Sequence, residues 1–228
     1  MAIEPKISRK DLKLKQPDQF QVLNARFVKF CLENRGALII VALVIIAVVA
    51  GFLFYSQLEK SNVLEMENRY FKLDKLRIQM EKEPTPALFS QMQEMLSGFT
   101  EGPQKIRARL LLADIHFREG RYGAAETLYQ DVINNISQND FKYNVAQSGL
   151  AYSLEGKKDY KRAIKIYKSI IDSAHGFPLF YTYVALSRCH ELSGDPKSAI
   201  LVLREIQSKF QRHSDIGKVS LMIRRLEG

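Results

Sequence analysis

The segment GRYGAAETLYQDV, residues 120–132, decides how most of this chain folds, because its pattern recurs twice further along. The recurrences are GKKDYKRAIKIYKSI over residues 156–170 and GDPKSAILVLREI over residues 194–206. Each begins with a glycine turn and then carries one alanine at the same place in a helical pattern: Ala125, Ala163 and Ala199. The alanines lie 38 and then 36 residues apart. Self-similarity at such a spacing indicates one structural unit used three times.

Each unit reads as two antiparallel helices, at the tetratricopeptide period of about 34 residues with a few residues inserted. A small residue in the first helix and the alanine in the second let the two helices approach closely, while tyrosines fill the gap to the next unit. The small residues of the first helices are Ala113, Gly149 and Ser187. The Gly-x-Tyr and Gly-Asp-Pro turns supply the reversal between helices. We therefore expect an all-α, TPR-like helical-repeat solenoid of three repeats over residues 104–228, closed by a capping helix near residues 215–226.

The segment before the repeats, residues 59–103, has a helical pattern too. An apolar stripe recurs at helical spacing through Met66, Tyr70, Leu73, Leu76 and Met80, which predicts a long helix packed on the rest of the domain. Pro84 should end it at Glu83. Thr85 and Pro86 then predict the N-cap and first position of a second helix, which Gly98 should end.

Toward the N-terminus, Ala37–Tyr55 reads ALIIVALVIIAVVAGFLFY, nineteen residues without a charge. At about 1.5 Å per residue this length can cross a hydrocarbon core of roughly 30 Å, so we expect a transmembrane helix over residues 37–58. A buried core helix would normally keep one polar face. A cleaved signal peptide would have a shorter n-region, and the helical pattern continues past Gly51.

The N-terminal part has two sections. Residues 1–18 are polar, basic and proline-containing, and are expected to be disordered. Residues 19–36 place Phe20, Leu23, Phe27 and Phe30 on one helical face, so they form either an amphipathic juxtamembrane helix on the lipid bilayer or an extension of the span. Eight basic and four acidic residues precede Ala37. Because Lys and Arg are retained in the cytoplasm, we expect a single-pass membrane protein with a cytoplasmic N-terminus and a translocated C-terminal domain.

Composition excludes several function classes. The net charge is +9, but the basic residues are scattered and match no nucleic-acid-binding motif. Cys31 and Cys189 would be separated by the bilayer, and Cys189 reads as a buried core residue. The histidines lack ligand or dyad spacing: His116, His175, His190 and His213. We expect no catalytic residue, no cofactor and no metal, hence a protein that is not an enzyme.

The expected working surface is a groove formed by the first helices of the repeats, where aromatic and Arg side chains combine buried area with adaptable polar contacts. Packing on a neighbouring repeat, or on the long helix that precedes the repeats, is the alternative role for each of these residues. The candidates are Arg107, Asp114, Phe117, Arg118, Tyr143, Leu150, Ser153, Tyr181, Arg188 and Glu191.

The order of parts resembles the YfgM-like proteins, ancillary subunits of the bacterial Sec translocon. The resemblance rests on RFVKF at residues 26–30, Asn34, one membrane span, a long exit helix and degenerate tetratricopeptide repeats. It implies an anchor in the cell inner membrane with a periplasmic repeat domain. It also implies an adaptor that associates with Sec translocon subunits and assists the handover of emerging polypeptides to periplasmic chaperones. Residues 1–18 are longer and more basic than the family suggests, which leaves room for another cytoplasmic partner.

Two other functions stay open on the sequence. One is a homo-oligomeric scaffold for envelope or cell-division machinery, associating through the exit and capping helices. The other is a cytoplasm-facing receptor similar in layout to organelle import receptors.

Overall fold

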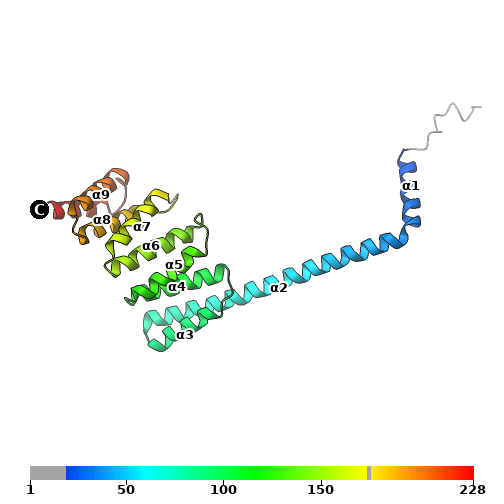
Figure 1. Cartoon of the computed structure of the whole chain (residues 1–228), viewed down its shortest axis with the longest axis horizontal. Helices are drawn as coiled ribbons and strands as arrows, with labels where there is room; N and C mark the ends of the chain where they lie inside the picture. The colour runs from blue at the N-terminus through cyan, green and yellow to red at the C-terminus, as the bar shows by residue number, and fades with distance from the viewer. Residues whose placement is uncertain (1–18, 174–175) are drawn as a thin grey trace, which may run out of the picture. The chain divides into compact units, whose positions relative to one another are not determined.

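The computed structural model describes residues 19–173 and 176–228, so the tail expected to be disordered, residues 1–18, and His175 lie outside the described residues. The described part contains ten helices and no strand (Figure 1). They are α1 (Gln19–Glu33), α2 (Arg35–Lys82), α3 (Pro86–Ser97), α4 (Pro103–Arg118), α5 (Tyr122–Asn134), α6 (Phe141–Gly156), α7 (Tyr160–Ser173), α8 (Phe180–Leu192), α9 (Pro196–Lys209) and α10 (Ile216–Glu227). The chain divides into two compact units, Met1–Asn62 and Val63–Gly228, and α2 contributes to both.

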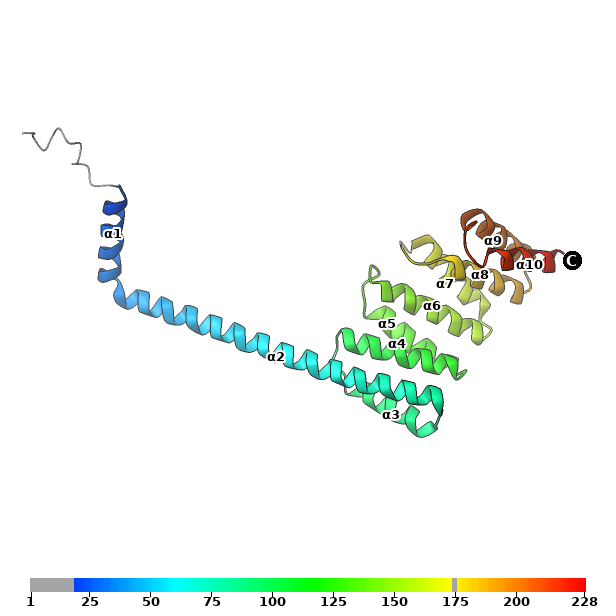
Figure 2. The ribbon, with the colours of Figure 1, turned by 180° about the vertical axis from the view of Figure 1, so that it is seen from behind.

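In the first unit, Asn34 separates α1 from α2, and the chain changes direction there (Figure 2). The backbone N–H of Asn34 donates to the Phe30 carbonyl oxygen at 3.0 Å, and its side-chain amide donates to the same oxygen at 3.1 Å. Because α1 ends at Glu33 and the chain changes direction before α2 begins, residues 19–33 form a separate helix and not a straight extension of the next one. Leu23, Phe27 and Phe30 are exposed on it.

The apolar part of α2 is long enough and apolar enough to cross a membrane, by length and composition. None of its most apolar window is buried by other described residues. Every large apolar side chain from Leu38 to Phe54 is exposed. Within the described part of the chain, nothing therefore covers this surface.

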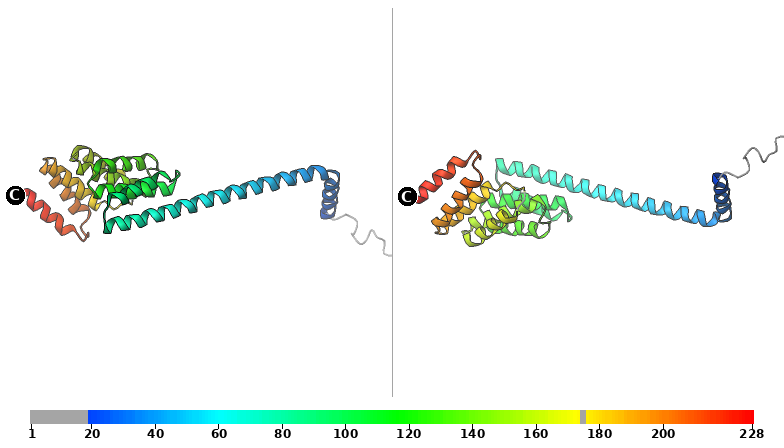
Figure 3. Two further views of the ribbon diagram at one scale, coloured as in Figure 1. Left: turned by 90° about the horizontal axis from the view of Figure 1, so that it is seen from below. Right: turned by 90° about the horizontal axis from the view of Figure 1, so that it is seen from above.

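In the second unit the helices stack as successive antiparallel pairs: residues 63–82 of α2 with α3, then α4 with α5, α6 with α7, and α8 with α9, and α10 closes the stack (Figure 3). We call residues 63–82 of α2 the exit helix. The apolar stripe predicted on it forms a core with α3 and α4, in which Leu73 and Met92 are fully buried. The Thr85 hydroxyl accepts from the Leu88 N–H at 3.3 Å, which confirms the predicted N-cap.

The small residues of the repeats have the packing role predicted for them. Ala125, Ala163 and Ala199 have no exposed surface. A Cβ atom built on Gly149 would lie 2.3 Å from the Tyr129 ring, so the second helix of one repeat packs directly on the backbone of the next. Only a glycine allows that approach.

One turn differs from the prediction. Gly120 and Gly194 have φ of 72° and 85°, the left-handed values expected of turn glycines. In the second repeat the left-handed residue is Lys158, with φ of 63°, and Gly156 ends α6. Because two residues are inserted there, the chain reverses after Gly156 and not at it. Gly156 instead leaves room for the Tyr122 ring, since it has no side chain.

Candidate partner-binding surface

Three of the ten predicted groove residues meet in one hollow of about 450 Å³ between the exit helix, α4 and α6. Its apolar floor includes Leu111 and Ile115, which are almost completely buried. We call this the α4 hollow. Its lining residues are Tyr70, Asp74, Arg77, Arg107, Leu110, Leu111, Asp114, Ile115, Arg118, Lys142 and Val145.

The arginines of the α4 hollow bind a row of acidic residues on the exit helix. Arg107 donates to Glu67 at 2.8 Å, and its guanidinium lies 3.9 Å from the centre of the Tyr70 ring. Arg118 and Arg77 both bind Glu81, at 2.9 and 2.8 Å. These pairs are at least partly exposed, so each contributes little stability. Their arginines can therefore exchange partners at low cost.

Asp114 is the unusual group in the hollow. Its carboxylate accepts a short hydrogen bond from the Tyr129 hydroxyl. Solvent reaches the residue, but the surrounding helices displace much of its water, and this desolvation raises the pKa of Asp114. Burial, followed by the nearby Asp114 charge, raises the pKa of Tyr129 as well. A concave surface explains how one residue can be both accessible and poorly hydrated.

Three predicted groove residues do not belong to an open surface. Leu150 is 4% exposed and Ser153 is fully buried, so both lie in the core. The Ser153 hydroxyl donates to the Gly149 carbonyl oxygen at 2.8 Å. Phe117 is partly buried against Tyr122 and against Tyr152 of the neighbouring repeat. The prediction was wrong for Leu150 and Ser153 because that side of α6 faces the helices packed on it, not the groove.

The remaining candidates are engaged in contacts within the stack. Arg188 of α8 makes a two-point contact with Glu155 of α6, and this bond raises the pKa of the guanidinium. The Tyr181 hydroxyl donates to Asp215 at 2.6 Å. Glu191 pairs with Arg225 of α10 at 2.7 Å. Tyr143 is half-buried, accepts a hydrogen bond from Gln147 at 3.3 Å, and does not line the α4 hollow.

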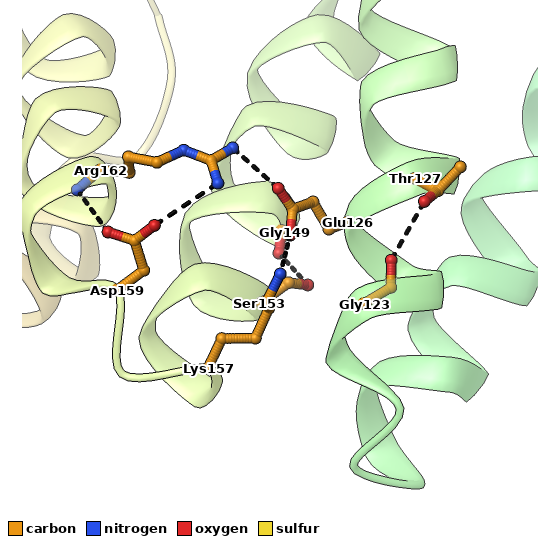
Figure 4. Close-up of polar contacts among 8 residues, drawn as sticks. All are labelled: Gly123, Glu126, Thr127, Gly149, Ser153, Lys157, Asp159 and Arg162. Atoms are coloured by element: carbon orange, nitrogen blue, oxygen red, sulfur yellow. Dashed lines mark hydrogen bonds and ion pairs between the residues drawn. The ribbon is translucent and has the colours of Figure 1, made fainter.

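A larger hollow, of about 580 Å³, lies beside α5, a second helix of its repeat. Three of its charged groups, Glu126, Lys157 and Arg162, form ion pairs with one another, as Figure 4 shows. Glu126 accepts hydrogen bonds from Lys157 and from Arg162, both at 2.7 Å. These bonds lower the pKa of Glu126, and the bond from Lys157 has the largest effect. Arg162 also contacts Asp159 at 3.4 Å. This network connects the first repeat to the second. The hollow beside α5 is larger than the α4 hollow, but its charged groups already serve the contact between repeats, so its volume alone does not make it the better partner site.

The sequence-based groove lacked the residues that the exit helix contributes to the α4 hollow. Tyr70 was assigned only to the packing stripe, and Asp74 and Arg77 were not singled out. A signal was present, because Glu67, Asp74 and Glu81 recur every seven residues beside that stripe. An acidic row next to a packing face indicates that basic residues of the next helix lie opposite.

Similarity to known proteins agrees with this architecture. The model of the tetratricopeptide repeat-like domain family matches residues 29–176, well over half of the chain. Among curated proteins, none matches the sequence.

Two similar solved structures contain nearly identical TPR-like repeats of a Podosopora anserina protein described as a kinesin light chain, one of them with a single substitution. Both have a TM-score of 0.58 and 14% identity, and each covers 71% of this chain. The matches cover 84% of the substituted chain and 85% of the other chain. At this identity the likeness is one of fold.

Helical repeats of this kind present extended surfaces to other proteins, so the fold is that of a protein–protein interaction adaptor. From the repeats, their packing and the matched region, the chain belongs to the tetratricopeptide repeat-like domain family.

Proposed function

We propose that this protein is a membrane-anchored adaptor of the cell inner membrane. Its repeat domain lies in the periplasm, associates with the Sec translocon and assists the handover of emerging polypeptides to chaperones. The observation that carries the proposal is the presence, in one chain, of an uncovered apolar helix and a tetratricopeptide repeat-like domain. A soluble adaptor would have no use for about nineteen exposed apolar residues, which water disfavours.

The topology in the proposal follows from charge. Eight of the basic residues precede Ala37, against four acidic ones. Retention of Lys and Arg in the cytoplasm orients the chain with its N-terminus inside. The link to the translocon rests on the resemblance of the whole layout to the YfgM-like proteins.

The α4 hollow supports a role in holding a polypeptide segment. Leu110, Leu111 and Val145 offer apolar contact. Arg107 and Arg118 can each turn a donor toward a backbone carbonyl or a carboxylate. A segment with one or two apolar side chains and an acidic residue matches this combination. Such mixed surfaces bind with adaptable polar contacts around a small apolar centre.

An alkaline phosphatase reporter fused after Gly228 tests the topology, because that reporter is active only in an oxidising compartment. We expect an active fusion. A fusion of the same reporter after Leu32 is the matched control and should be inactive. A well-expressed but inactive fusion after Gly228 would contradict the periplasmic assignment.

Partner capture is tested by placing a photoreactive amino acid at Arg118, in the α4 hollow, and at Thr127, in the larger hollow beside α5. Both positions are exposed. We expect adducts with translocon subunits, chaperones or emerging chains from Arg118 and few from Thr127. Adducts from Thr127 alone would move the working surface to α5, and co-purification in mild detergent without any translocon subunit would contradict the proposed association.

A further inference from the structure

The exit helix has a second apolar stripe, on the side that the repeat domain leaves uncovered. Leu64, Phe71 and Ile78 are 65%, 59% and 43% exposed. They recur every seven residues along α2. Isolated exposed apolar residues are ordinary, but three on one helical line form a continuous surface.

This stripe lies opposite the packing stripe of the same helix. Met66, Leu73 and Met80, which are buried against α3 and α4, also recur every seven residues. With Leu64, Phe71 and Ile78 placed at the d positions of a heptad, the three buried residues fall at f, the position that points directly away from a coiled-coil partner. The repeat domain and a second helix can therefore occupy α2 at the same time.

The a positions of this register are polar. Asn68 and Lys75 occupy them, and both are exposed. A polar residue at a weakens a two-stranded coil but fixes its register and limits it to two strands. The Lys75 ammonium lies 4.7 Å from the centre of the Phe71 ring, so its alkyl chain extends the apolar stripe.

Charge on the flanks favours a second copy of this same chain. In a parallel, in-register pair, a residue at g faces the residue five positions later, at e, on the other helix. Here g is Glu67 and the facing e residue is Lys72, so the same attractive pair forms twice. Glu67 is still about half-exposed despite its contact with Arg107. The ion pairs formed among residues 19–173 and 176–228 do not include Lys72.

We propose that two copies of this protein associate in parallel through the exit helices, with Leu64, Phe71 and Ile78 at the seam and Glu67 of each copy paired with Lys72 of the other. The seam covers little more than two heptads and would be weak between free molecules. Two copies anchored in one bilayer with the same orientation meet in parallel at a high effective concentration. This self-association adds to the proposed adaptor function and can be tested apart from it.

Cysteine cross-linking of the full chain in its native membrane tests the seam. Cys31 is replaced by serine; Cys189 stays, because burial raises the pKa of its thiol to about 12 and leaves it unreactive. Leu64→Cys and Phe71→Cys should give a disulfide-linked dimer under mild oxidation, since facing seam positions come within the about 7 Å between Cα atoms that a disulfide tolerates. Val63→Cys is the matched control, because it is exposed and adjacent in sequence but points off the seam.

We expect at least about tenfold more homodimer from Leu64→Cys than from Val63→Cys. Equal yields at the two positions, no dimer at either seam position, or adducts with a different polypeptide would each overturn the proposal. None of these outcomes changes the reporter or co-purification results by which the adaptor function is judged.

A charge exchange tests the register. Lys72→Glu places two acidic residues opposite each other and should lower the Leu64→Cys dimer yield several-fold. Adding Glu67→Lys to the same chain restores an attractive pair and should restore the yield. If Lys72→Glu leaves the yield unchanged, the in-register parallel arrangement is wrong.

Discussion

The first helices of the repeats behave differently at the two ends of the stack. Near the exit helix, Arg107, Asp114 and Arg118 surround the α4 hollow and solvent reaches them. At the other end, Tyr181 and Glu191 occupy comparable positions but are bonded to residues 215–227. The capping segment therefore holds the polar groups of these two side chains, although Tyr181 is still 55% exposed, whereas Arg107 and Arg118 are held by the exit helix. Position in the stack thus decides which neighbour each first-helix residue contacts.

Removal of α10 should give the largest effect. A chain ending at Ser214 loses Val219 and Ile223 and uncovers Leu203 and Ile206, which are fully buried. Two buried aliphatic side chains correspond to a loss on the order of 3–6 kcal/mol. Hydrogen exchange should show protection lost in α8 and α9 but retained in α3 and α4. Equal loss throughout would show that the two ends unfold together.

The contact between the first and second repeats, where Tyr129 packs on Gly149, should be sensitive to a single added methyl group. Gly149→Ala puts a Cβ atom 2.3 Å from the Tyr129 ring and should destabilise the domain by about 1–3 kcal/mol. Gly123→Ala is the control, since nothing lies within 4 Å of its added Cβ atom, and it should stabilise α5 by about 0.5–1 kcal/mol. Urea unfolding measures both. A neutral Gly149→Ala would mean that Tyr129 can move away at no cost.

Replacing one arginine at each end compares a partly buried ion pair, Arg188 with Glu155, with an exposed one, Arg118 with Glu81. Arg188→Ala leaves Glu155, whose side chain is only 13% exposed, without its two-point partner and should cost about 1.5–3 kcal/mol. Arg118→Ala removes an exposed contact and should not change stability measurably. Thermal unfolding of both variants distinguishes them. Equal destabilisation would remove the contrast between the ends.

The two ends should also differ in the sign of a small pH effect. The pKa of Asp114 is raised above 3.8 by desolvation, so the stability tied to its protonated form is complete below that pH and is lost as pH rises through the folded-state pKa. Asp114→Asn should therefore stabilise the neutral-pH protein, by less than about 0.5 kcal/mol because solvent screens the charge. The amide oxygen of the new side chain can still accept the hydrogen bond from the Tyr129 hydroxyl.

At the capped end, the Lys218 contact and then the Tyr181 hydroxyl lower the pKa of Asp215. Its contribution is present above pH 3.8 and is lost as pH falls through the folded-state pKa. Asp215→Asn should thus destabilise at neutral pH, the opposite of Asp114→Asn. Unfolding midpoints of both variants measured from acidic to neutral pH check this, and shifts of the same sign would contradict it.

The repeats were predictable from sequence because short-range signals agree there. Glycine turns, alanines and tyrosines recur with the helices they build, and the N-cap at Thr85 was identified from two residues. Cys189 proved to be buried, as its helical position suggested.

The working surface was less predictable because it depends on which helix packs opposite. A helical pattern shows that Leu150 and Ser153 share a face, but not that other helices bury it. The α4 hollow needs Asp74 and Arg77 of the exit helix, and the whole of α3 lies between these residues and α4 in the sequence. Lys158 shows a similar limit, since the sequence pattern favours the glycine two residues earlier as the left-handed residue.

The contact of Tyr129 with Gly149 makes the order of the repeats part of the design. Tandem duplication of the first repeat would place Tyr129 against a second copy of Ala113, at the position where Gly149 lies now. The methyl group of that alanine would occupy the space that the Tyr129 ring fills in this chain. Lengthening of this array through gene duplication would therefore need a compensating change at the new junction, either a glycine in place of Ala113 or a different placement of the Tyr129 ring. The repeats share a sequence pattern, but their contacts with the next repeat differ, so they are not interchangeable modules.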